Sequence, residues 1–139
     1  MESTQASASQ LVKAGMLRLC DDFTQLIAPL GFIRTRSDSR AWQRQQHGYV
    51  EQIYLHRSGS SYGASRNNSV AIRAQFSVRS LGDDQVAAPL YSDLLRDSNG
   101  HAYHLRFNAL SWSTYDRCLT DLGRVTQEHG FPWFNRQRA

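Results

Sequence analysis

Lysine is almost absent from this chain. Of its 16 Lys and Arg residues only Lys13 is lysine, and no run of five or more like charges occurs. The absence of a basic run argues against a disordered tail that binds nucleic acid. Arginine contacts carboxylates and phosphates through a planar fork and stacks on aromatic rings, which lysine does poorly. The net charge of +4 therefore favours an anionic partner, although a GC-rich genome also explains an arginine bias.

Cysteine and long apolar runs are scarce as well. Cys20 and Cys118 stand far apart in two helical patterns, so they give neither a zinc-site spacing nor a disulfide framework. No apolar run approaches the roughly 18 residues that span a membrane. Residues 1–10 lack the charged start and apolar centre of a secretion signal. We therefore expect a cytoplasmic protein with free thiols, no cofactor and no membrane contact.

A stretch with a period of two is the clearest structural signal. Residues 69–78 alternate apolar and polar side chains, which is typical of an antiparallel strand with one face on a core and one in water. On this pattern the side chains expected to be buried are Val70, Ile72, Ala74, Phe76 and Val78. Arg73 and Gln75 are then expected on the open, polar face.

The rest of the chain supplies a sheet and its helical cover. We expect a single domain over 1–139, with residues 1–10 disordered and a mobile loop at 58–68. The fold class is α+β, a two-layer arrangement in which an antiparallel sheet of about five strands has two long helices packed on one face. The patterns predict a helix with the apolar stripe Val12, Met16, Leu19, Phe23, Leu26 and Leu30, which stops at 29–32 with Gly31 in the left-handed region. They then predict strands at 32–36, 40–46, 49–57 and 69–78, a short helix at 89–96, a strand at 101–108, and a closing helix capped by Ser113 and Gly130.

Several of these pieces occur in a recognisable order. A leading amphipathic helix is followed by Pro29-Leu30-Gly31-Phe32, Trp42 with Arg44, a strand from Val50 to Arg57, a long alternating strand, and a closing helix before Pro132-Trp133-Phe134. This order resembles the bacterial family filed as domain of unknown function 4304. The resemblance covers most of the chain and implies a small cytosolic α+β protein. It supplies no activity and no catalytic residues. Small bacterial proteins of this type are often partners of secreted toxins.

The open sheet face is the surface on which we place function. Alternation sends cationic, aromatic and amide side chains to this face, which no predicted helix covers. The residues that we expect to bind a partner are Tyr54, His56, Arg73, Gln75, His104 and Arg106. Tyrosine and arginine often anchor protein interfaces, and the same types also stack bases and pair phosphates of single-stranded nucleic acid.

Two function classes follow from this face, and a third remains open. The first is a non-enzymatic binding protein, an immunity-type protein that neutralises a toxin by occluding an acidic toxin domain. The alternative is a single-stranded nucleic-acid-binding protein that uses the same basic face. A metal-free nuclease that uses His56 and His104 as general acid and base is the third. A metal site is not favoured, because His101 and His104 are three apart in a predicted strand and would point to opposite faces.

Overall fold

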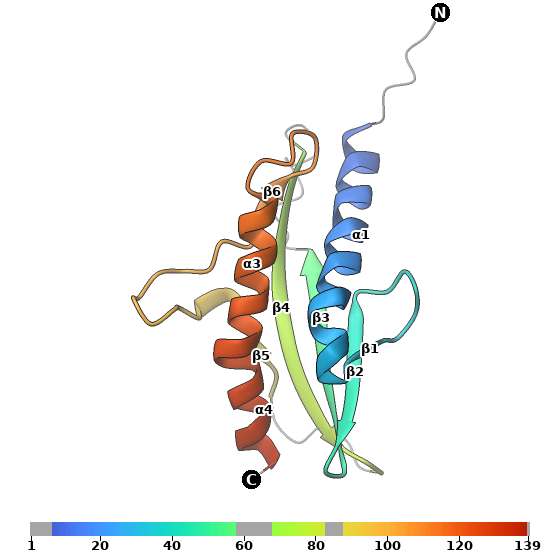
Figure 1. The fold of residues 1–139 in the computed structure, drawn as a ribbon, viewed down its shortest axis with the longest axis vertical. Coiled ribbons are helices and arrows are strands. Elements are labelled where there is room, and N and C mark those ends of the chain that lie inside the picture. Colours follow the sequence, from blue (N-terminus) through green and yellow to red (C-terminus); the bar gives the residue numbers. More distant parts are fainter. Residues whose placement is uncertain (1–6, 58–67, 83–87, 139) are drawn as a thin grey trace, which may run out of the picture.

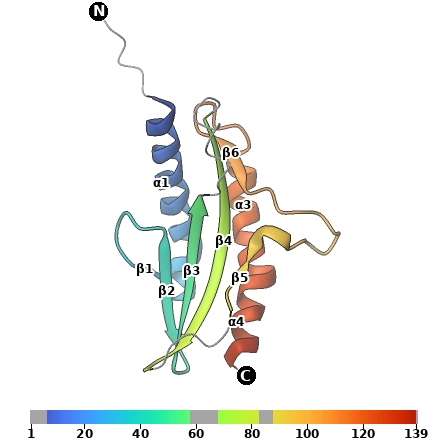
Figure 2. The same cartoon turned by 180° about the vertical axis from the view of Figure 1, so that it is seen from behind.

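Two helical segments lie side by side on one face of an antiparallel sheet (Figures 1 and 2). The computed structural model describes residues 7–57, 68–82 and 88–138, and it confirms the two-layer α+β fold class. The named elements are α1 (Ala8–Ile27), β1 (Ile33–Arg34), β2 (Ala41–Gln46), β3 (Tyr49–Arg57), β4 (Ser69–Ser80), β5 (Leu90–Tyr91), β6 (Arg106–Asn108), α3 (Tyr115–Val125) and α4 (Phe131–Arg138).

The sheet is built around β4, its longest strand. Its strands run in the order β1-β2-β3-β4-β5, and β6 pairs with the start of β4. Because β3 pairs with β4 along most of its length, Ile53 lies opposite Phe76 and Leu55 opposite Ala74. All four side chains are buried. Arg73 and Gln75 are partly exposed on the opposite face, so the predicted alternation of β4 is confirmed.

The first helix begins earlier than expected. Ser7 caps it, since its Oγ accepts from the Gln10 N–H and the Gln10 side chain accepts from the Ser7 N–H. This capping box stabilises the first turn, so the expectation of disorder over residues 1–10 is wrong for Ser7 to Gln10. Residues 1–6 lie outside the described part of the chain.

The last turn of the first helix buries a different side chain from the ones that the spacing predicts. Leu26 and Leu30 are 45% and 41% exposed, whereas Ile27 is 2% exposed and takes their place in the core. The helix passes into a 3₁₀ turn over Ala28–Leu30 that accommodates Pro29, and Gly31 follows with φ +97°. That left-handed conformation, which glycine adopts without strain, is as predicted.

Three expected elements between residues 32 and 108 are shorter or different. The first strand contains only Ile33–Arg34. The expected helix over 89–96 is instead β5 followed by a 3₁₀ turn over Ser92–Leu94. The buried Ser92 Oγ accepts from the Ala74 N–H at 2.9 Å, which satisfies the edge of β4 beside β5. The loop expected over 58–68 lies outside the described residues except for Asn68.

The expected strand over 101–108 is formed only at 106–108. Asp97 Oδ1 accepts from the backbone N–H groups of Asn99 and His101, each at 2.9 Å. The His104 N–H donates to Asp121 Oδ2 at 2.7 Å. These side-chain acceptors replace a strand partner, so the segment between the 3₁₀ turn and Leu105 projects away from the sheet (Figure 1).

The closing helix begins one residue later than expected and continues past its expected end. Thr114, at φ +63°, precedes α3 without a side-chain cap, so the Ser113 cap is wrong. Gly130 does not end the helix either, because a π-helical turn over Thr126–Gly130 leads directly into α4. A Cβ on Gly130 would lie 2.5 Å from Phe76 Cε1, so the glycine allows close approach of helix and sheet. Phe134 is fully buried there.

Both cysteines are buried and free. Burial raises the pKa of the Cys20 thiol to about 11 and that of Cys118 to about 12. None of the helices in the described part of the chain has the length and apolar character that a membrane span requires.

Candidate functional site

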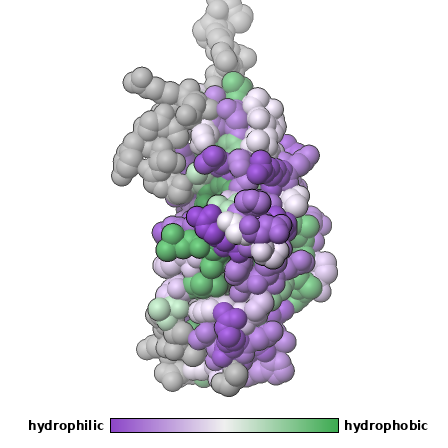
Figure 3. Space-filling model, turned by 90° about the vertical axis from the view of Figure 1, so that its left-hand side faces the viewer, coloured by the Kyte–Doolittle hydropathy of each residue, from purple (hydrophilic) through white to green (hydrophobic). Residues whose placement is uncertain are grey.

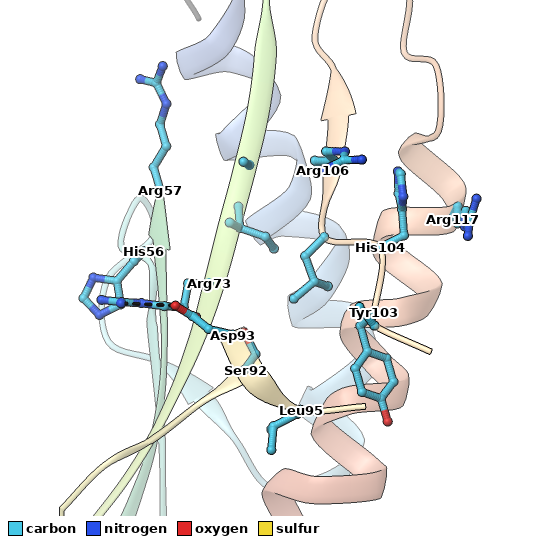
Figure 4. A pocket seen from close by; sticks show the side chains of 14 residues that line it. His56, Arg57, Arg73, Ser92, Asp93, Leu95, Tyr103, His104, Arg106 and Arg117 are labelled. Atoms are coloured by element: carbon cyan, nitrogen blue, oxygen red, sulfur yellow. Dashed lines mark ion pairs between the residues drawn. The ribbon is translucent and has the colours of Figure 1, made fainter. Parts of the chain in front are cut away.

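A groove of about 680 Å³ lies beside β4, where the chain leaves the sheet after β5 and returns at β6. Figure 4 shows its lining side chains arriving from β3, β4, the 3₁₀ turn, the segment before β6, and α3. Four arginines and two histidines line it, and Asp93 is the one carboxylate among the lining residues. The ionisable lining residues are His56, Arg57, Arg73, Asp93, Tyr103, His104, Arg106 and Arg117.

At the end formed by β3 and β4, two of the three basic side chains, His56 and Arg73, have partners within the protein, and Arg57 has none among the described residues. His56 Nε2 donates to Gln75 Oε1 at 2.5 Å. Arg73 lies 3.5 Å from Asp93 in an ion pair, and its guanidinium lies 4.4 Å from the Tyr91 ring centroid. This end of the groove is therefore partly neutralised and braced by contacts within the protein.

At the other end, His104 stands with Arg106 and Arg117 (Figure 4). Burial, together with the charges of Arg117 and Arg106, holds the pKa of His104 below its ordinary value. The ring is thus mainly neutral at neutral pH. Neither arginine has an ion pair among the described residues, and both are exposed to solvent.

An ionic cluster fixes the bulging segment against α3. Arg124 pairs with Asp97 at 3.3 Å, with Asp121 at 3.2 Å and with Glu128 at 3.3 Å. The Tyr103 hydroxyl donates to the same Glu128 carboxylate. These contacts hold one wall of the groove in place, because Asp97 and Tyr103 belong to the segment and the other groups to the helical layer.

The structure brings four of the six predicted residues into one groove. His56, Arg73, His104 and Arg106 line it. Tyr54 and Gln75 do not line it but support His56: the rings of Tyr54 and His56 are 4.6 Å apart, and Gln75 accepts the hydrogen bond described above. Binding of a partner by these six residues stays a prediction.

Sequence reasoning missed Arg57, Arg117, Tyr91, Asp93 and Leu94. Arg117 is on an exposed position of α3, and nothing in its local pattern says that this face of the helix lies beside His104. Tyr91 and Asp93 fell in a segment expected to be helical. Arg57 ends β3, and the alternation that placed His56 on the open face did not place Arg57 in the groove.

Apolar side chains project beside the groove. Leu94 is 91% exposed and directly follows residues that β4 holds through the Ala74–Ser92 hydrogen bond and the Arg73–Asp93 ion pair, and Tyr91 is 39% exposed. Figure 3 views this side of the molecule and shows hydrophobic patches within a mainly hydrophilic surface. A single exposed leucine is common on protein surfaces, so Leu94 supplies apolar contact area beside the groove and does not by itself mark a binding site.

Comparisons with known proteins add no relative. The chain matches no protein-family model, no curated protein and no solved structure. Within the described residues, no group of three or more His, Cys, Asp or Glu side chains is placed to hold a metal ion.

Proposed function

We propose that the protein is a non-enzymatic binding protein whose groove holds an acidic segment of a protein partner. The observation that carries this proposal is the charge imbalance of the groove, in which four arginines and two histidines face one carboxylate. An anionic partner would neutralise this excess. Complementary charge of this kind accelerates encounter and selects against partners of the same sign.

A protein partner fits the groove better than single-stranded nucleic acid does. Nucleic acid without secondary structure binds by stacking bases on free aromatic faces. Here Tyr91 lies beneath the Arg73 guanidinium, while Tyr54 packs on His56 and lies 5.8 Å from the Arg40 guanidinium. The exposed Leu94 offers apolar contact but no stacking surface.

In its most specific form, the proposal is an immunity-type protein that occludes an acidic toxin domain in the cytoplasm. Two features support this form: the resemblance of the chain order to the family described above, and a concave basic surface with an exposed leucine beside it. Occlusion requires no catalytic group, since affinity and coverage of the toxin surface are sufficient.

The test uses the protein encoded by the gene next to that of this chain, because a toxin and its immunity protein are encoded side by side. Calorimetry should show binding of this neighbour to the wild-type chain. The double variant Arg73→Glu with Arg106→Glu should bind at least about tenfold more weakly, which corresponds to about 1.4 kcal/mol.

A matched control carries the same change of charge outside the groove. Arg79 and Arg136 are both exposed and line no part of the groove, so Arg79→Glu with Arg136→Glu should bind nearly as wild type. Equal weakening in both double variants would show that only net charge matters. Tight, steeply salt-dependent binding of a mixed oligonucleotide, with no binding of the neighbour, would favour the nucleic-acid alternative.

A further inference from the structure

The two ends of the groove differ in how their arginines are neutralised. Arg73 is paired with Asp93 and stacked on Tyr91. Arg106 and Arg117 have no carboxylate partner in the part of the chain that the structure describes. Figure 4 places them on either side of His104. Arg57, at the end of β3, also lacks a carboxylate partner among these residues, so the end near β6 and α3 holds two of the three unpaired arginines of the groove.

The segment that carries His104 and Arg106 is fixed by hydrogen bonds from both sides. The Ile72 N–H donates to the Leu105 carbonyl at 2.9 Å on the sheet side. On the helix side, the His104 N–H donates to Asp121 Oδ2 at 2.7 Å, and Thr114 Oγ1 donates to the Arg106 carbonyl at 3.1 Å. The backbone is thus held before a ligand arrives, which lowers the entropic cost of binding.

The His104 ring has one unused polar atom at this place. Its Nε2 is buried and has no hydrogen-bond partner among the described residues. An unpaired buried polar atom is unfavourable, so a ligand group that reaches it gains free energy that an exposed atom would not supply. Two unpaired guanidiniums beside one unpaired ring nitrogen are donors suited to an oxyanion.

We infer that His104, Arg106 and Arg117 form a subsite for one side-chain carboxylate of the acidic partner, an inference that rests on the proposed function. The guanidiniums bind the carboxylate oxygens through their planar N–H groups, and His104 lies between them. Arg73 has a different role, because its charge is already paired with the Asp93 carboxylate. Arg73 forms part of the groove wall.

Binding at this subsite takes up a proton from solvent. The charges that face His104 are Arg106 on β6, Arg117 and Asp121 on α3, while His56, Arg57, Arg73 and Asp93 share the groove from β3, β4 and the 3₁₀ turn. An added carboxylate offsets the two arginines and favours the charged imidazole. Affinity therefore rises as the pH falls from about 7.5 to about 6, around the ordinary histidine pKa of about 6.5.

Fluorescein-labelled octaglutamate is the probe, and anisotropy measures its binding to the full chain. Arg106→Gln and Arg117→Gln should each weaken binding at least about tenfold. Arg79→Gln removes an exposed arginine outside the groove and should change binding little. In parallel, NMR of the wild-type imidazoles should show the pKa of His104 rising when octaglutamate is added, a signal that does not depend on any variant folding.

Four outcomes would contradict the inference. Equal effects of Arg79→Gln and Arg106→Gln, or an unchanged His104 titration, overturn the subsite. Loss of binding in Arg73→Gln but not in Arg106→Gln or Arg117→Gln also overturns it, yet leaves the groove as an acidic-segment binder. No binding of octaglutamate to the wild type, with binding of an oligothymidylate of the same length, overturns both the subsite and the proposed function.

Discussion

The buried side of the sheet and the groove hold arginine in different ways. On the helix-covered face, the fully buried carboxylate of Glu51 lies between Arg44, at 2.6 Å, and Arg138, at 2.7 Å. In the groove, Arg106 on β6 and Arg117 on α3 have no carboxylate partner among the described residues. The same side chain thus serves as an internal brace in one place and as an available cation in the other.

The buried triad ties together parts of the chain that are far apart in sequence. Glu51 is on β3, Arg44 on β2 and Arg138 at the end of α4. Arg44 also donates to the Leu30 carbonyl at 2.9 Å and lies 4.5 Å from the Phe32 ring centroid. Neighbouring carboxylates, rather than the number of arginines, therefore decide which arginines are free to contact a partner.

Removing the buried carboxylate should have the largest effect on stability. Glu51→Gln leaves two guanidiniums facing a neutral amide, and breaking a buried ion pair in this way costs about 3–5 kcal/mol. Chemical denaturation measures the loss. As the open-face control, Asp93→Asn breaks a pair whose side chains are 37% and 50% exposed and should cost under about 1 kcal/mol. Similar losses in both variants would show that the buried triad contributes no more to stability than the exposed Arg73–Asp93 pair.

A smaller effect is expected where α4 approaches the sheet. Gly130→Ala would place a Cβ 2.5 Å from Phe76 Cε1, and overpacking of this kind costs about 1–3 kcal/mol. In a helix without such a contact, the same change would stabilise by about 1 kcal/mol, so the sign is the test. Adding Phe76→Leu makes room and should recover part of the loss. Additive effects in thermal denaturation would show that the two residues do not meet.

The fold was largely predictable because alternation and helical spacing report burial directly. The strand over 69–78, its buried Phe76 and the helical cover all follow from such local patterns. Residues 89–96 were not predictable in this way, because Leu90, Leu94 and Leu95 are spaced as in a helix. Their conformation is decided by a distant contact, the hydrogen bond from Ala74 to Ser92.

The candidate site shows the same limit. Alternation places His56 and Arg73 on one face, since they are paired across β3 and β4. Arg117 joins His104 only because α3 packs beside β6, and Gly130 faces Phe76 only because α4 packs on the sheet. Neither relation leaves a trace in the local sequence. The proposed role of the groove remains a prediction.

The pH dependence of the free energy of unfolding should report the lowered pKa of His104. Because its pKa is lowered in the folded chain, the unfolded chain binds more protons as the pH falls below about 6.5. The free energy of unfolding should therefore decrease between about pH 7 and about pH 5 through this residue. Denaturation of His104→Gln over the same range should show a shallower slope. An identical slope in both proteins would mean that His104 titrates alike in the folded and unfolded chains.

The smallest expected change in stability is at the groove arginines Arg106 and Arg117. Arg106→Gln and Arg117→Gln alter exposed side chains without ion pairs among the described residues, so each should change stability by less than about 0.5 kcal/mol. Arg44→Gln, which leaves Glu51 short of one partner, should cost clearly more. NMR adds a second readout: since the charge of Arg117 lowers the pKa of His104, Arg117→Gln should raise it. If Arg106→Gln destabilises the fold as much as Arg44→Gln does, the groove arginines are structural braces, and the contact surface must be sought elsewhere.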